Sequence, residues 1–117
     1  MIANVGNWMQ SARYPLTGMT ISSMRLVFAC VYLKRTVLDA VGPLDERFTA
    51  YGGEDDDYSL RIQKAGYSLA VTPEVQVRHG FGKGVGTSSY GREPNQPALA
   101  ERARDIFQTK WGWRLKT

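Results

Sequence analysis

The sequence predicts a mixed α/β fold, organised as one domain. Three observations lead to this prediction: an eight-residue apolar run at 26–33, a helical apolar pattern at 95–112, and strand-like and helix-like segments that alternate between them. A chain of 117 residues is long enough to bury one modest core. We therefore expect strand, helix, helix, two strands and helix, in that order.

The first third of the chain is expected to hold one strand and one short helix. Residues 1–25 mix Gly6, Pro15 and Gly18 with isolated aromatic and methionine residues, so they predict an irregular N-terminal segment. The run 26–33 is rich in Val, Phe and Tyr and has the length of a buried strand. Residues 34–41 predict a short helix that Gly42-Pro43 ends.

The remainder predicts two longer helices separated by strands and a loop. An acid-headed helix runs from residue 54 or 55 to Lys64-Ala65-Gly66, whose cation and glycine suit a helix end. Two short strands, 67–71 and 75–78, are expected to flank Thr72-Pro73-Glu74, before a glycine-rich loop at 80–91. Asn95-Gln96-Pro97 then begins a helix that ends at Gly112 and has an apolar face made of Leu99, Ala103, Ile106, Phe107 and Trp111.

The composition excludes several classes of partner and site. The net charge is only +4, and the arginines are scattered, so we expect no nucleic-acid partner. Cys30 is the sole cysteine, which excludes an intrachain disulfide and a thiolate zinc site, and a buried inert thiol is expected. The longest apolar run is far shorter than the ~20 residues that span a bilayer, and the N-terminus lacks a signal-peptide pattern, so a cytoplasmic location is expected.

The run Glu54-Asp55-Asp56-Asp57 places four carboxylates in the first turn of the predicted helix. The helix dipole favours negative charge there by roughly 0.3–1 kcal/mol per group, but neighbouring acids repel one another, so stability explains one or two of them. Asp57 can pair with Arg61 one turn later, and Asp56 is expected to face solvent. Glu54 and Asp55 remain as candidates to accept a proton or a hydroxyl from a substrate.

The same acids satisfy a literal Asp-x-Asp pattern, which in other contexts holds a metal ion. Positions two apart on a helix point about 200° away from each other, so Asp55 and Asp57 do not converge easily on one ion. We therefore expect no metal site built from these two aspartates.

His79 and the loop after it form a second candidate region. This sole histidine follows a predicted strand and precedes the glycine-rich loop, a position where α/β proteins assemble sites, although a single histidine is usually an ordinary surface or core residue. Backbone amides of Gly80–Thr87 could surround phosphates, with Lys83 supplying charge. The loop fits neither Gly-x-Gly-x-x-Gly nor the Walker pattern, so a flexible lid and a plain solvated linker stay open.

Several motifs, taken together and in order, resemble the C-terminal half of GT-A glycosyltransferases. The closest similarity is to family 2, and Gly-Gly-Glu-Asp-Asp-Asp is also similar to the C-terminal galactosyltransferase domain of family 7. The resemblance covers roughly residues 26–112, and residues 113–117 form a tail. The motifs are Phe28 to Arg35, Val41 to Phe48, Gly53 to Asp57, Arg61, Lys64 to Tyr67, Pro73, Arg78-His79 and Phe107 to Gly112.

This resemblance implies inverting transfer of a sugar from a nucleotide-diphosphate donor to an acceptor hydroxyl. Asp55 would be the general base, and Glu54 would hold hydroxyls of the acceptor or sugar. His79 would ligate a divalent ion, manganese or magnesium, on the diphosphate. The substrate-binding residues would be Tyr51, Gly52, Gly53, Asp57, Arg78 and Lys83.

The nucleotide-binding first half of that fold is expected to be missing from these 117 residues, which makes this a partial GT-A fold. Its Asp-x-Asp would normally precede residue 26, and the metal is expected only together with that half. The partners implied are a nucleotide sugar, a carbohydrate-type acceptor and a complementing N-terminal half. The alternative is a non-catalytic interaction module that forms a homo-oligomer through an exposed sheet edge or apolar surface.

Overall fold

The computed structural model has the expected mixed α/β character. It describes residues 2–7, 20–22, 25, 26, 28, 30–48, 52–77 and 95–115. The four strands and three helices, in chain order, are β1 (Ile2–Asn7), β2 (Thr20–Ser22), β3 (Val31–Tyr32), α1 (Arg35–Val41), α2 (Glu54–Lys64), β4 (Leu69–Val77) and α3 (Gln96–Trp111).

The strands form one sheet in the order β2-β4-β1-β3. Strand β1 runs parallel to β4, with Ile2 opposite Leu69 and Asn4 opposite Val71, whereas β2 and β3 are antiparallel to their neighbours. The prediction that residues 1–25 are irregular is therefore wrong for β1 and β2. These segments have weak strand patterns of their own, and pairing with β4 overrides that local preference.

Two other strand predictions need correction. Among the described residues of the run 26–33, only Val31–Tyr32 form a strand. The backbone amide of Leu26 instead donates to Ser59 Oγ on α2, 3.1 Å away, and Phe28 packs edge-on against Tyr58 at 5.9 Å between ring centroids. Leu26 and Phe28 are apolar because they pack on a helix, and periodicity alone does not separate that case from a buried strand.

The two short strands predicted at 67–71 and 75–78 are one continuous strand, β4, that passes through Pro73. Proline has no backbone N–H to donate, so Pro73 removes one donor from the pairing of β4. The structure keeps the strand but shifts its register against β1 between Val5 and Asn7, which pair with Thr72 and Val77. An irregular step of this kind is how a sheet accommodates a residue that cannot pair.

The predicted helices are confirmed. Helix α1 ends at Gly42, which has φ 81° and donates its amide to the Leu38 carbonyl at 2.8 Å. Helix α2 begins after Gly53 and ends at Lys64, and α3 carries Pro97 in its first turn and ends at Gly112 in the left-handed conformation. None of the helices in the described part of the chain is long and apolar enough to cross a membrane.

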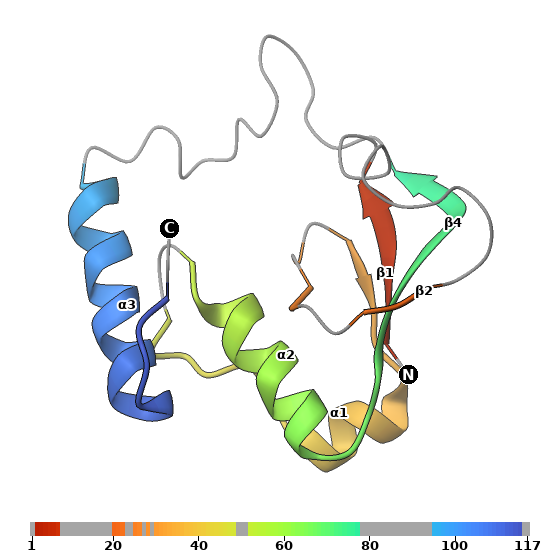
Figure 1. Cartoon of the computed structure of the whole chain (residues 1–117), viewed down its shortest axis with the longest axis horizontal. Coiled ribbons are helices and arrows are strands. Elements are labelled where there is room, and N and C mark those ends of the chain that lie inside the picture. The colour runs from red at the N-terminus through yellow and green to blue at the C-terminus, as the bar shows by residue number, and fades with distance from the viewer. Residues whose placement is uncertain are drawn as a thin grey trace, which may run out of the picture.

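Helix α2 lies between the sheet and α3 (Figure 1). Each side of α2 packs into a separate core cluster. The larger cluster joins α2 to α1 and β4, and the smaller one joins it to α3. The larger cluster consists of Leu26, Val37, Tyr58, Ile62, Leu69 and Val71. The smaller cluster consists of Phe48, Ala103 and Phe107, with Leu60, Ile106, Trp111 and Leu115 packed around it.

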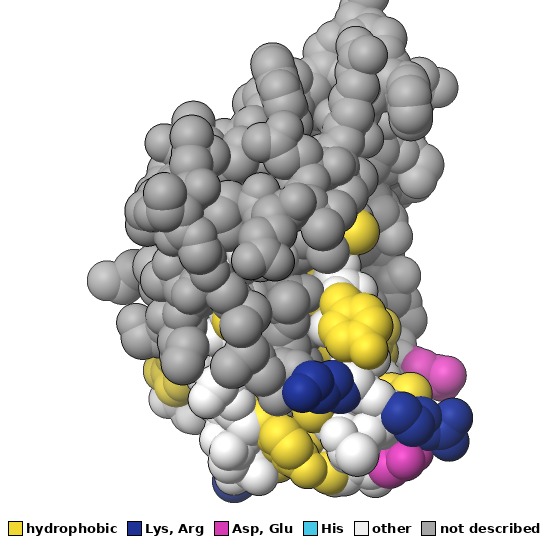
Figure 2. All heavy atoms as spheres, turned by 90° about the vertical axis from the view of Figure 1, so that its right-hand side faces the viewer, with side chains coloured by type: hydrophobic (Ala, Val, Ile, Leu, Met, Phe, Trp, Pro, Cys, Tyr) yellow, Lys and Arg dark blue, Asp and Glu magenta, His cyan; other side chains and the backbone are white. Residues whose placement is uncertain are grey.

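Figure 2 shows one outer face of the molecule. Over its described part, hydrophobic side chains lie next to side chains of both charge signs. The described part of this face therefore carries no continuous basic surface of the kind that binds a polyanion.

Candidate functional site at the start of helix α2

The chain enters α2 through two glycines in left-handed conformations. Gly52 has φ 77° and Gly53 has φ 90°, and the Gly53 carbonyl accepts the amide of Asp57 at 2.8 Å. A Cβ atom built on Gly53 would lie 2.9 Å from the Phe48 ring, whereas one on Gly52 would meet nothing within 4 Å. Position 53 therefore requires a glycine, both because of its backbone angle and because the Phe48 ring leaves no room for a Cβ. We call residues Glu54–Asp57, which follow it, the acidic turn.

Within the acidic turn, Asp57 is the residue whose side chain is buried in the protein interior. Its side chain is 1% exposed, and its Oδ1 lies 2.8 Å from both Lys110 Nζ and Trp111 Nε1–H. Its Oδ2 lies 3.7 Å from Arg61, which confirms the predicted pair, but accepts no hydrogen bond within the described part of the chain. Because its contacts come from other parts of the same chain, we assign Asp57 a structural role rather than substrate contact.

The prediction that Asp56 faces solvent is wrong. Its side chain is 27% exposed, and its Oδ1 lies 2.6 Å from Arg25 Nε. Burial raises the pKa of Asp56 to about 6, repulsion from Asp55 and Glu54 adds to this rise, and Arg25 opposes it. Arg25 therefore offsets only part of the burial and repulsion that disfavour the charged form of Asp56.

Glu54 and Asp55 have no cationic partner among the described residues, unlike the two acids that follow them. Both are half-buried, and Asp55 Oδ1 accepts the backbone amide of Asp56 at 2.8 Å. Burial raises the pKa of Glu54, and its Oε2 atom is enclosed without a hydrogen-bond partner in the described part of the chain. These two carboxylates are thus the members of the acidic turn that could engage a ligand.

The remaining predicted site residues fall outside the described ranges; they are Tyr51, Arg78, His79 and Lys83. The assignment of His79 as a metal ligand and of Lys83 as a phosphate contact therefore stays a prediction. Within the described residues, no group of three or more His, Cys, Asp or Glu side chains is arranged to hold a metal ion. The acidic turn by itself does not fit a metal centre, because Asp56 and Asp57 face cations of the protein.

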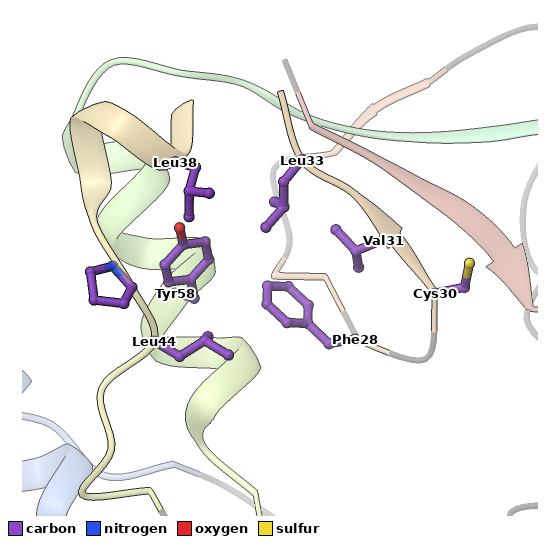
Figure 3. Close-up of a pocket in the computed structure, with 8 residues that line it drawn as sticks. Phe28, Cys30, Val31, Leu33, Leu38, Leu44 and Tyr58 are labelled. Atoms are coloured by element: carbon purple, nitrogen blue, oxygen red, sulfur yellow. The ribbon is translucent and has the colours of Figure 1, made fainter. Parts of the chain in front are cut away.

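An apolar pocket of about 480 Å³ lies beside α2, next to Tyr58, the residue that directly follows the acidic turn (Figure 3). Tyr58 forms one wall, and its hydroxyl donates to the Gly42 carbonyl at 2.7 Å. The rest of the lining comes from residues before, within and after α1: Phe28, Cys30, Val31, Leu33, Leu38, Pro43 and Leu44. Cys30 is therefore only half-buried and borders a cavity, which sequence reasoning did not anticipate.

Sequence reasoning also missed Arg25, Asp45 and Lys110. Lys110 Nζ bridges Asp57 and Asp45, at 2.8 and 2.7 Å, from a position more than fifty residues along the chain. Arg47 and then Lys110 hold the pKa of Asp45 well below its ordinary value. The pair of Asp57 and Arg61 leaves a local spacing signal, whereas the contacts of Arg25 and Lys110 depend on how residue 25 and α3 fold back onto α2.

Comparison with known proteins gives one informative match. The chain is 32% identical over 85 residues to uncharacterized protein y4gI of Sinorhizobium fredii (strain NBRC 101917 / NGR234). The match covers 71% of this chain but only 9% of that protein, so the chain spans about a tenth of its relative's length. No protein family matches the chain, and no solved structure matches it.

Proposed function

We propose that the acidic turn carries the catalytic base of an inverting glycosyltransferase, with Asp55 as that base. The observation that supports this most is the division of charge within the turn. Asp56 and Asp57 face Arg25, Lys110 and Arg61, whereas Asp55 has no cationic partner among the described residues. A carboxylate free of an internal ion pair, at the entrance of a helix, is available to accept a proton.

In the proposed reaction, Asp55 takes the proton of an acceptor hydroxyl as its oxygen attacks the anomeric carbon of the donor sugar. The bond from that carbon to the diphosphate breaks, and the electron pair leaves with the diphosphate. Attack from the side opposite the leaving group inverts the anomeric configuration. Glu54, whose Oε2 lacks a partner in the described part of the chain, suits a hydrogen bond to a sugar or acceptor hydroxyl.

The donor side of the site is also part of this proposal. The resemblance assigns diphosphate and metal contacts to His79, Arg78 and Lys83, and assigns the base and ribose to a preceding half of the fold. A divalent manganese or magnesium ion bound there would stabilise the leaving diphosphate.

Thermal unfolding tests whether this chain binds the donor. We expect nucleotide-diphosphate sugars with Mn²⁺ to raise the Tm of the wild type and of Asp55→Asn alike, because binding precedes proton transfer and does not need the base. The metal alone serves as the control. Equal Tm values with and without nucleotide sugar would contradict donor binding by this chain.

The second candidate is a non-catalytic interaction module. The observation that favours it is the exposure of large apolar side chains on and beside the pocket lining: Tyr32 is 61% exposed, Leu38 38% and Leu44 46%. Exposed apolar surface of this kind often marks a protein contact. Light scattering over a range of concentrations separates the candidates, because a strictly monomeric wild type would exclude self-association. A dimer that Leu44→Lys dissociates would favour the module.

A further inference from the structure

Lys110 holds both ends of the chain segment that contains the candidate site. Its Nζ lies 2.7 Å from Asp45 Oδ2 and 2.8 Å from Asp57 Oδ1. Gly52, Gly53, Glu54 and Asp55 all lie between these two anchors. The three charged side chains are well shielded, with exposed fractions of 23% for Lys110, 13% for Asp45 and 1% for Asp57.

Trp111 adds a second contact from the same end of α3. Its Nε1–H donates to the same Asp57 oxygen that Lys110 contacts, at 2.8 Å. The Trp111 ring also lies against Phe107 in the smaller core cluster, and Lys64 lies over it at 5.9 Å. The position of Asp57 is therefore set by the packing of α3, through two adjacent residues.

We propose that Lys110 and Trp111 are positioning residues that fix Asp55 for its task, an inference that rests on the proposed function. Asp57 and Asp55 belong to one helical turn, and the Asp57 amide is bonded to the Gly53 carbonyl at 2.8 Å. A shift of the anchored Asp57 carboxylate would therefore move Asp55 and the Gly53 turn with it. Lys110 also compensates the Asp57 charge, which would otherwise be buried beside other carboxylates.

This role differs from a general contribution to stability. Arg61 also faces Asp57, at 3.7 Å, and bonds to carbonyls at the end of α1. Lys110 instead joins α3 to the segment between residues 45 and 57. Its loss should loosen that segment more than it loosens α1.

Hydrogen exchange of backbone amides tests the proposal without requiring activity. In Lys110→Met we expect the Asp57 amide to exchange faster, on the order of tenfold, while the Gly42 amide, bonded to Leu38 in α1, keeps its wild-type rate. Lys110→Arg should restore protection, because it keeps the charge and reach. Lys34→Met, which removes an exposed lysine elsewhere, should leave both rates unchanged.

Two outcomes would overturn the proposal: unchanged exchange at Asp57 in Lys110→Met, or equal acceleration at Asp57 and Gly42. If Lys110→Met does not fold, Trp111→Phe gives a second test, because it keeps an aromatic ring and removes the N–H donor together with part of the indole. In a transfer assay, Lys110→Met should lower kcat with little change in KM, and Lys110→Arg should recover it. Protection lost at Asp57 with no Asp55-dependent transfer would contradict the proposed function while confirming the anchor.

Discussion

At the scale of single residues, four adjacent acids have four different environments. Asp57 is buried against Lys110 and Trp111, Asp56 pairs with Arg25, Glu54 has an enclosed oxygen without a described partner, and Asp55 accepts only its neighbour's amide among the described residues. Their spacing along the helix predicted that the acids would divide, and it correctly paired Asp57 with Arg61. It could not predict Arg25 or Lys110, because both reach the turn through tertiary folding.

Gly53→Ala should destabilise the protein more than Gly66→Ala. Both positions have positive φ, 90° and 87°, so each alanine carries a backbone strain of roughly 1 kcal/mol. Only at Gly53 does the added Cβ also collide with a ring, that of Phe48 at 2.9 Å, which should cost about 1 kcal/mol or more in addition. Urea unfolding of both variants measures the difference. Equal losses would show that the contact with Phe48 relaxes freely.

The Asp56 carboxyl should give stability a distinct pH dependence. Its folded pKa, about 6, lies above the ordinary 3.8, so between these values the folded state binds more protons than the unfolded state. The free energy of unfolding contributed by Asp56 therefore falls as pH rises through this window. Asp56→Asn lacks that fall, so its stability relative to wild type should increase from pH 4 to pH 6 and then level off. Parallel stability curves in this range would contradict the raised pKa.

At the scale of elements, the sequence predicted helices better than strands. Each helix carries its own signals: Gly42 and Gly112 end α1 and α3, and acids head α2. Strands β1 and β2 pair with β4, which lies far away along the chain, and Leu26 and Phe28 pack on α2 instead of entering the sheet. Such pairings involve distant segments and leave no local pattern.

Helix α2 also stabilises the end of α1, and Arg61 is the residue that does so. Its guanidinium donates to the Val41 carbonyl at 2.7 Å and to the Pro43 carbonyl at 2.8 Å, which places a cation at the C-terminal end of a helix. Arg61→Met should lower the free energy of unfolding by about 2 kcal/mol, because it removes charged hydrogen bonds. Arg35→Met, which removes an exposed pair with Asp39, is the matched control and should cost less than about 0.5 kcal/mol. Similar losses in the two variants, measured by chemical denaturation, would exclude this role.

At the scale of the whole molecule, the candidate site depends on segments from both ends of the chain. Arg25 reaches the acidic turn from the N-terminal side and also lies over the Trp113 ring at 5.1 Å, and Lys110 reaches the turn from α3. The sequence identified the acidic turn, with Glu54 and Asp55 as candidates, and the family resemblance singled out Asp55 as the base. Among the described residues, the surroundings that leave Asp55 without a cation follow only from the packing of α3 and residue 25 on α2.

The rate of nucleoside diphosphate release from a nucleotide sugar, measured with an alcohol acceptor and Mn²⁺, tests the central claim most directly. We expect Asp55→Asn to lower this rate by about 10²–10⁴-fold, the usual contribution of a positioned base, and to leave the far-UV spectrum unchanged. Asp56→Asn, the adjacent and isosteric control, should retain the activity. A measurable wild-type rate that Asp55→Asn leaves unchanged would contradict the assignment of Asp55 as the base.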